Sequence, residues 1–185
     1  MEDARPSQAL GQLFSVPLPP EYDLLQCLKT TKQSPIHHPE GNVWNHTMLV
    51  VDEAAKRRGE SSSPEVLMWA ALLHDIGKPD TTRVWKGKIT SYDHDKVGAG
   101  LARRFLYGFG VSRAHIDKVC ILIRYHMQML FVVKNMPYAD VQGMKQSTDI
   151  KEVALLGLCD RLGRLHADLA TEQANVRLFL KKCGQ

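Results

Sequence analysis

The sequence lacks long apolar runs, a secretory signal and closely spaced cysteines. No apolar stretch approaches the ~20 residues that a membrane-spanning helix needs, so we expect no membrane association. The first residues include the acids Glu2 and Asp3 and no apolar run, which argues against a signal for secretion. The four cysteines lie far apart and form no Cys-x-x-Cys pair, which argues against a zinc finger. We therefore expect buried, reduced thiols in a cytoplasmic protein.

The sequence does have the composition of one globular domain. Its 185 residues are 44% hydrophobic and 24% charged, which is enough for a single hydrophobic core. We expect an N-terminal arm over residues 1–20, where prolines interrupt helical periodicity, and one domain over residues 21–185. The net charge of +4 is compatible with phosphate-bearing partners such as nucleotides or RNA but does not require them. The oligomeric state stays open.

Apolar residues recur with helical spacing along most of the chain, which predicts an all-α helical bundle with at most one small β-hairpin. Asn42 and Ser112 are predicted N-caps, and Pro64 suits the first turn of a helix. The hairpin is predicted where two short segments flank Lys86-Gly87. The expected helices cover about residues 21–31, 43–58, 65–76, 97–108, 113–126, 149–165 and 171–182.

The stretch Leu72-Leu73-His74-Asp75-Ile76-Gly77-Lys78 combines strongly apolar and strongly polar residues. It closes the apolar run 66–73 with an imidazole and a carboxylate side by side. Polar groups that leave water need partners, and a metal ion is a partner that satisfies both groups. Further ligands must then come from other parts of the chain.

Other polar residues also interrupt apolar helix faces or lie at helix ends. Taken singly, a histidine on an apolar face is more often a hydrogen-bonded core residue than a ligand. Likewise, Asp160 has Arg161 and Arg164 nearby as ion-pair partners. Taken together, several buried imidazoles and carboxylates predict a site for Mn, Fe, Co, Ni or Zn. These residues are His46, His94, His126 and Asp160.

Three motifs give this chain a family resemblance. They are HHPEGNVWNHT at 37–47, LHDIGKP at 73–79 and DRLGR at 160–164. In this order they resemble the HD-domain superfamily of metal-dependent phosphohydrolases, and most closely the HD domain that accompanies bacterial tRNA CCA-adding nucleotidyltransferases. The resemblance covers residues 36–165. The sequence shows no nucleotidyltransferase domain and no acidic signature of one, so we expect a stand-alone HD domain.

The resemblance implies a set of metal ligands. The family has a four-ligand pattern, H…HD…D, and a longer pattern that adds two histidines between the HD pair and the last aspartate. His94 and His126 fall in that interval. They either bind a second ion, with Asp75 as the bridging ligand, or act as acid–base or phosphate-binding groups. The implied cofactor is one or two divalent ions of Mn, Fe, Co, Ni or Zn, with Mg also allowed. The family pattern H…HD…D assigns the first ion to His46, His74, Asp75 and Asp160.

The resemblance also suggests catalytic and substrate-binding residues. With Asp75, Lys78 and Asp95 are the predicted catalytic residues. Lys78 either binds phosphate or is a solvated lysine at a helix end, and Asp95 is either a general base or a partner of a ligand histidine. For Arg161 and Arg164, the alternative to binding phosphate is a salt bridge to a carboxylate of the site. The predicted substrate-binding residues are Lys78, Arg161, Arg164 and His38.

The predicted activity is hydrolysis of phosphate esters of nucleotides, cyclic nucleotides or RNA ends. A small phosphorylated substrate, a nucleotide above all, is the expected partner. Trp85, on the predicted hairpin near His94, is a candidate to stack on a base. Two alternatives stay open: an HD-fold oxygenase with a dinuclear iron site, and a non-catalytic HD module that binds RNA or a partner protein.

Overall fold

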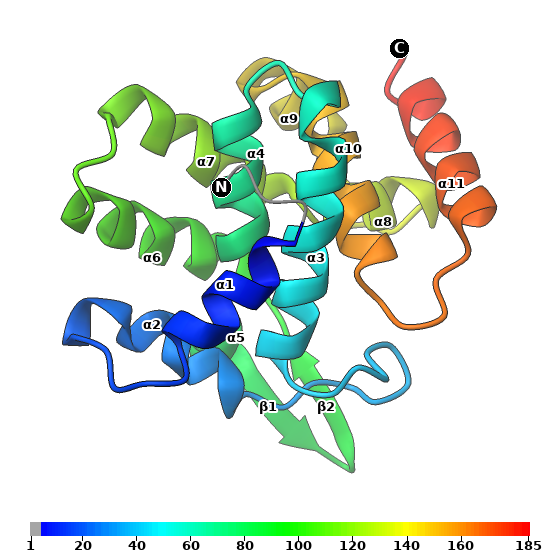
Figure 1. Ribbon diagram of the computed structural model, residues 1–185. Coiled ribbons are helices and arrows are strands. Elements are labelled where there is room, and N and C mark those ends of the chain that lie inside the picture. Colours follow the sequence, from blue (N-terminus) through cyan, green and yellow to red (C-terminus); the bar gives the residue numbers. More distant parts are fainter. Residues whose placement is uncertain (1–4) are drawn as a thin grey trace.

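The computed structural model describes residues 5–185. The first four residues of the predicted arm, which include Glu2 and Asp3, lie outside the described part. Within this range the protein is a bundle of helices with one two-stranded antiparallel sheet, which confirms the predicted fold class (Figure 1). The helices are α1 (Pro6–Leu13), α2 (Asp23–Gln26), α3 (Val43–Arg57), α4 (Pro64–Leu73), α5 (Lys78–Thr81), α6 (His94–Gly108), α7 (Arg113–Tyr125), α8 (Gln128–Val133), α9 (Val141–Ser147), α10 (Ile150–Leu162) and α11 (Leu169–Lys182). The strands are β1 (Thr82–Trp85) and β2 (Lys88–Ser91), and short 3₁₀ turns cover Pro20–Tyr22, Cys27–Lys29 and Arg58–Glu60.

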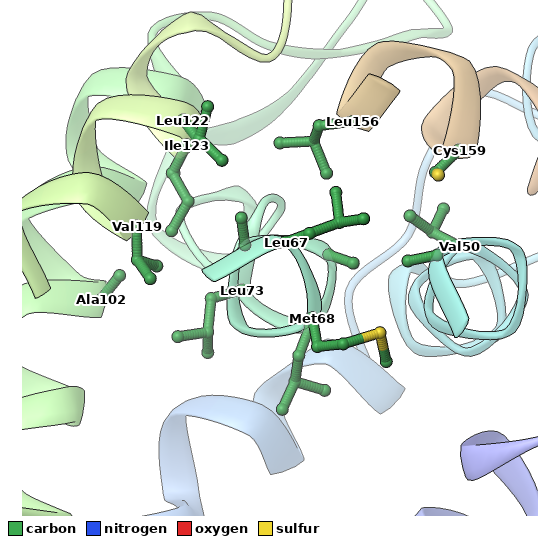
Figure 2. Packing of buried hydrophobic residues seen from close by; sticks show 14 of the residues in the cluster. Val50, Leu67, Met68, Leu73, Ala102, Val119, Leu122, Ile123, Leu156 and Cys159 are labelled. Atoms are coloured by element: carbon green, nitrogen blue, oxygen red, sulfur yellow. The ribbon is translucent and has the colours of Figure 1, made fainter. Parts of the chain in front are cut away.

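Helix α4 forms the centre of the bundle. It packs against α3, α7 and α10, and its uniformly apolar sequence explains why it can be buried on nearly every side. Figure 2 shows Leu67 and Leu73 of α4 surrounded by Val50, Ile123 and Leu156 from these neighbours. The helix ends at Leu73, about a turn earlier than predicted. His74 and Asp75 come directly after it and are buried in the core.

Polar caps define the ends of the helices that carry the site. The Asn42 side chain accepts the amide N–H of Asn45 at 2.9 Å and so caps α3, as predicted. Ser112 caps α7 in the same way, and Pro64 occupies the first turn of α4. These local signals explain why the sequence alone locates the starts of three central helices.

The N-terminal segment differs from the irregular arm that the prolines suggested. Pro6 opens α1, because proline suits the first turn of a helix. The helix is tied to α3 by Ser7, whose backbone N–H and hydroxyl donate to the two carboxylate oxygens of Asp52 at 3.0 and 2.6 Å. Phe14 is buried against Tyr22 and Trp44. The segment is therefore helical and docked.

Gly77 allows the turn after α4 to approach α6 closely. A Cβ atom on Gly77 would lie 2.2 Å from the carbonyl oxygen of His94 and 2.6 Å from the amide nitrogen of Gly98. Only glycine fits such a contact without moving the backbone. The close approach holds Asp75 near His94.

The hairpin connects α5 to α6. Its register pairs Val84 with Ile89, and the two turn residues Lys86 and Gly87 both have positive φ, as a tight two-residue hairpin turn requires. The sheet prediction is therefore confirmed. Among residues 5–185, no helix is long and apolar enough to cross a membrane.

Candidate metal centre

Five elements deliver the predicted metal ligands to one place in the interior. The ligands come from α3, from the turns after α4 and α7, from the first residue of α6 and from the last turns of α10. All of their side chains are buried. The structure thus brings together His46, His74, Asp75, His94, His126 and Asp160.

One group of ligand atoms lies on the α3 side of the site. Nε2 of His46 is 3.0 Å from Oδ1 of Asp160, and Nε2 of His74 is 3.3 Å from Oδ2 of Asp75. The rings of His46 and His74 are 5.4 Å apart and steeply inclined to each other. Single ligand atoms of His46, His74 and Asp75 lie close enough together to hold one ion.

A second group shares Asp75 with the first. Oδ1 of Asp75 is 3.4 Å from Nε2 of His94 and 3.9 Å from Nε2 of His126. The two histidine nitrogens are 3.1 Å apart. The two oxygens of one buried carboxylate therefore face different histidine groups, which is the arrangement expected of a ligand that bridges two ions.

Backbone contacts fix which nitrogen of three candidate ligand histidines is protonated. Nδ1 of His74, His94 and His126 lies 2.9, 2.6 and 2.7 Å, respectively, from a backbone carbonyl oxygen. A carbonyl only accepts, so each Nδ1 must donate its hydrogen, and Nε2 of the neutral ring carries a lone pair. The accepting carbonyls belong, in the same order, to Ala71, Ser91 and Ile123.

These lone pairs need a cation. Burial lowers the pKa of His126 to about 3, and burial also lowers the pKa of His94. Both rings are therefore neutral near pH 7, and their Nε2 lone pairs face each other at 3.1 Å. Nε2 of His74 is buried with no hydrogen-bond partner in the described chain. The residues present thus fit divalent metal ions, because an ion at each of the two groups would satisfy these nitrogens.

His46 differs from the other histidines because carboxylates lie at both of its ring nitrogens. Nδ1 is 2.9 Å from Oε1 of Glu40, opposite the contact between Nε2 and Asp160. Burial opposes a charged ring, but the two carboxylates outweigh it and raise the pKa of His46. Glu40 also accepts a hydrogen bond from Nδ1 of His38 at 2.8 Å. The sequence interpretation assigned Glu40 no role, although it lies within the first family motif.

Basic side chains hold the site aspartates in their ionised form. Although burial acts in the opposite direction, the neighbouring His74 and Lys78 lower the pKa of Asp75 well below its usual value. Arg164 and His46 do the same for Asp160, again against burial. Ionised carboxylates are the form that binds metal.

A cavity of about 610 Å³ is lined by four of the six candidate ligands, Asp75, His94, His126 and Asp160. Lys78 lines it and is only 7% exposed, with Nζ 2.6 Å from Oδ2 of Asp75 and 3.0 Å from Oε1 of Gln33. Lys78 is therefore a buried cation of the site, and the solvated alternative does not hold. Arg164 also lines the cavity, with Nη2 3.5 Å from Oδ1 of Asp160.

Asp95 and His38 line the same cavity. Asp95 is buried and receives a hydrogen bond from Nη1 of Arg124 at 2.5 Å. Arg124, which the sequence interpretation did not select, is thereby held at the cavity wall. Further lining residues with apolar or aromatic side chains are Ile89, Tyr92, Met127, Phe131, Met136 and Tyr138.

Arg161 is the predicted substrate-binding residue that the structure does not bring to this cavity. Its Nε and Nη2 donate to Oε1 of Glu172 on α11 at 3.1 and 2.9 Å. Arg161 lies one residue after Asp160 on the same helix, so its side chain points in another direction. The contact with Glu172 ties α10 to α11.

Comparison with known proteins supports this picture. The family described as the HD domain matches residues 43–165, which include all six candidate ligands. The chain belongs to the HD-domain family. HD domains are a superfamily of metal-dependent hydrolases, and the His/Asp clusters of this chain are suited to a divalent ion.

Curated proteins that this chain resembles are named multifunctional CCA proteins and tRNA nucleotidyltransferases. The chain is 33% identical over 118 residues to a multifunctional CCA protein of Actinobacillus pleuropneumoniae, which covers 64% of this chain and 26% of the relative. It is 27% identical over 181 residues to a multifunctional CCA protein of Alkalilimnicola ehrlichii, which covers 97% of this chain and 34% of the relative. An A-adding tRNA nucleotidyltransferase of Deinococcus radiodurans is 31% identical over 100 residues, which cover 53% of this chain and 22% of the relative. The HD domain thus spans between a fifth and about a third of the length of these relatives.

Proposed function

We propose that this HD domain is a metal-dependent phosphohydrolase that acts on phosphate esters of nucleotides, cyclic nucleotides or RNA ends. The observation that carries the proposal is the position of Asp75. Its carboxylate faces one histidine group through Oδ2 and another through Oδ1, beneath a cavity with basic walls. A volume of about 610 Å³ lies in the range of ordinary small-molecule sites.

The ligands divide into two sets around Asp75. His46, His74, Asp75 and Asp160 would hold one divalent ion, and Asp75, His94 and His126 would hold a second. Such ions supply a water of lowered pKa and positive charge beside the phosphate. The predicted metals, Mn, Fe, Co, Ni, Zn or Mg, all remain candidates for this site.

Basic side chains at the cavity wall are suited to bind the substrate's phosphate. Lys78 places a buried ammonium beside Asp75, and Arg124 and Arg164 add guanidinium groups. Nε of Arg164 is buried and has no hydrogen-bond partner within residues 5–185, so the contact with Asp160 leaves part of this guanidinium unsatisfied. These positive charges favour a phosphate ester over an uncharged substrate.

Two further residues are placed to handle a proton or a hydroxyl group. Glu40 accepts the hydrogen on Nδ1 of His38, and burial lowers the pKa of His38 to about 3, so Nε2 is an acceptor near pH 7. His38 can therefore orient a substrate hydroxyl or a water. Asp95, fixed by Arg124, is the candidate general base at the same cavity.

The proposal is tested by metal analysis followed by a hydrolysis screen. Purified protein should bind a divalent transition metal and release phosphate from some mono-, di- or cyclic phosphate ester. Asp75→Asn should lower both metal content and turnover. Asp117→Asn, at a carboxylate on the outer side of α7, should change neither. Metal-loaded protein without turnover of any phosphate ester would overturn the proposal.

The same buried ligand set also suits the second candidate, a dinuclear-iron oxygenase. The two functions differ in their need for oxygen. Hydrolysis that proceeds under argon with manganese or nickel supports the phosphohydrolase. A reaction that requires iron and oxygen and releases no phosphate supports the oxygenase.

A further inference from the structure

The hairpin β1–β2 carries three positive charges and no negative charge of its own. Between Thr82 and Tyr92 the chain contains Arg83, Lys86 and Lys88 and no acidic residue. All three cations are exposed, and none forms an ion pair within residues 5–185. The other cations near the site, such as Lys78 and Arg124, are already paired with carboxylates.

The register places two of these cations on one face with an exposed tryptophan. Arg83 pairs with Thr90 and Trp85 pairs with Lys88, and residues opposite each other in a ladder point to the same face. Since side chains alternate along each strand, Arg83, Trp85, Lys88 and Thr90 share that face. Trp85 is 70% exposed, which is unusual for so large an aromatic side chain.

This face adjoins the cavity of the metal centre. Residues 89–91 of strand β2 and Tyr92 after it form part of the cavity wall, and the chain then enters α6 at the candidate ligand His94. Tyr92 is itself 76% exposed. Figure 1 shows the hairpin projecting from the helical bundle, so the chain that lines the cavity continues into the exposed strand β1.

We propose that the face formed by Arg83, Trp85, Lys88 and Thr90 binds a single-stranded polynucleotide whose terminal phosphate lies in the cavity. The inference rests on the proposed phosphohydrolase function and names its substrate class, a polynucleotide end. Cations complement the phosphate backbone, and an exposed indole between them offers a surface on which a base can stack. A single strand is required, because the bases of a duplex are not free to stack on a side chain.

The charge pattern of the hairpin also favours a polynucleotide over an apolar partner. Lys86 holds its Nζ 4.4 Å from the centroid of the Trp85 ring, so the indole and an ammonium form one joint contact surface. Alternation of cations with an aromatic ring matches the alternation of phosphates with bases along a strand. An apolar partner would leave the charges of Arg83 and Lys88 without compensation.

Binding is tested on the full chain in the presence of a chelator, so that no hydrolysis occurs. The probes are labelled RNA and DNA oligonucleotides of the same unstructured sequence, each with a terminal phosphate. Trp85→Ala should weaken binding about tenfold. Arg83→Glu/Lys88→Glu should weaken it further and should reduce the salt dependence of the affinity, by about 0.7 in logarithmic slope for each lost phosphate contact.

A matched variant controls for overall charge. Arg104→Glu/Lys118→Glu makes the same charge change at exposed positions on α6 and α7, and it should retain most of the binding. If it weakens binding as much as the hairpin variant does, or if Trp85→Ala has no effect, the proposed surface is wrong. Equal affinity of the wild-type protein for anionic lipid vesicles would also contradict a polynucleotide site.

A separate measurement distinguishes failure of this inference from failure of the proposed function. Hydrolysis of a mononucleotide by the metal-loaded wild-type protein tests the proposed function, because a mononucleotide is small enough to be hydrolysed in the cavity, which the indole of Trp85 does not line. In Trp85→Ala, hydrolysis of an oligonucleotide end at subsaturating concentration should fall about tenfold with the affinity. Mononucleotide turnover without oligonucleotide binding would overturn the hairpin inference alone.

Discussion

Nε2 of His94 and Nε2 of His126 face each other at 3.1 Å in the interior of the protein. Each ring donates its other N–H to a backbone carbonyl, so neither Nε2 carries a hydrogen when the rings are neutral. Two facing lone pairs repel unless a cation lies between them. The contact therefore supports the proposed second metal position next to Asp75.

The first prediction concerns metal stoichiometry. His126→Ala should remove about one of two bound equivalents of metal, because Asp75 and His94 alone supply too few ligands for the second ion. The metal content of the dialysed protein measures this directly. His166→Asn, at an exposed histidine, should bind as much metal as the wild-type protein. Full occupancy in His126→Ala would rule out the assigned second position.

The second prediction concerns Glu40. Its Oε1 lies 2.9 Å from Nδ1 of His46 and so orients the ring whose Nε2 faces Asp160. Glu40→Ala should lower metal affinity about 10- to 100-fold, as expected for a residue that orients a ligand. Competition with a metal chelator gives the affinity, and Glu21→Ala is the control at an exposed carboxylate. An affinity within twofold of the wild-type value would show that His46 does not need Glu40.

The third prediction concerns pH. Burial lowers the pKa of both His38 and His126 to about 3, whereas the unfolded chain has a histidine pKa near 6.5. The unfolded state therefore binds more protons below pH 6.5, and the free energy of unfolding should fall as the pH drops from about 6.5 towards 3. The slope is at most about 1.4 kcal/mol per pH unit for each histidine.

Urea unfolding of the chelator-treated protein at several pH values measures this slope. His126→Gln should make the slope shallower between pH 6.5 and 4, because one depressed histidine is removed. The pKa of His46 is raised, so this residue lowers the free energy of unfolding as the pH rises above 6.5. It does not change the expected fall in the free energy of unfolding below pH 6.5. A free energy of unfolding that is independent of pH in this range would contradict the burial of neutral histidines.

The fourth prediction concerns Gly77. Gly77→Ala should lower the free energy of unfolding by about 1–3 kcal/mol, because its Cβ would lie 2.2 Å from the backbone of His94. Gly100→Ala is the matched control on α6, where a Cβ meets nothing within 4 Å. This control should be neutral or stabilising by up to about 1 kcal/mol, since alanine favours helix. Equal effects of the two substitutions would contradict the close approach.

Much of the fold follows from local sequence signals. The apolar run 66–73 predicted the central helix, and caps such as Asn42 and Ser112 located the starts of others. Helix α9 gave no such signal, because Met144 is its one buried residue and a single apolar side chain creates no periodicity. The prolines of residues 1–20 were interpreted as a sign of an irregular arm, whereas Pro6 occupies the first turn of α1.

The sequence by itself determined which residue types are available for chemistry and in what order they occur. The succession of His46, His74-Asp75 and Asp160 on apolar helices was sufficient to indicate a metal centre of the HD type. These are local properties, set by the spacing of side chains along each helix. The assignment of each residue to a ligand position remains a prediction for the metal analysis to test.

Only the tertiary structure decided which atoms meet. His46 and Asp160 are 114 positions apart, and their contact depends on the packing of α3 against α10. The packing of α10 against α11 turns Arg161 towards Glu172, and the approach of α6 to the turn after α4 sets the two oxygens of Asp75 against different histidines. Long-range distances of this kind follow from how helices pack, which no local pattern specifies.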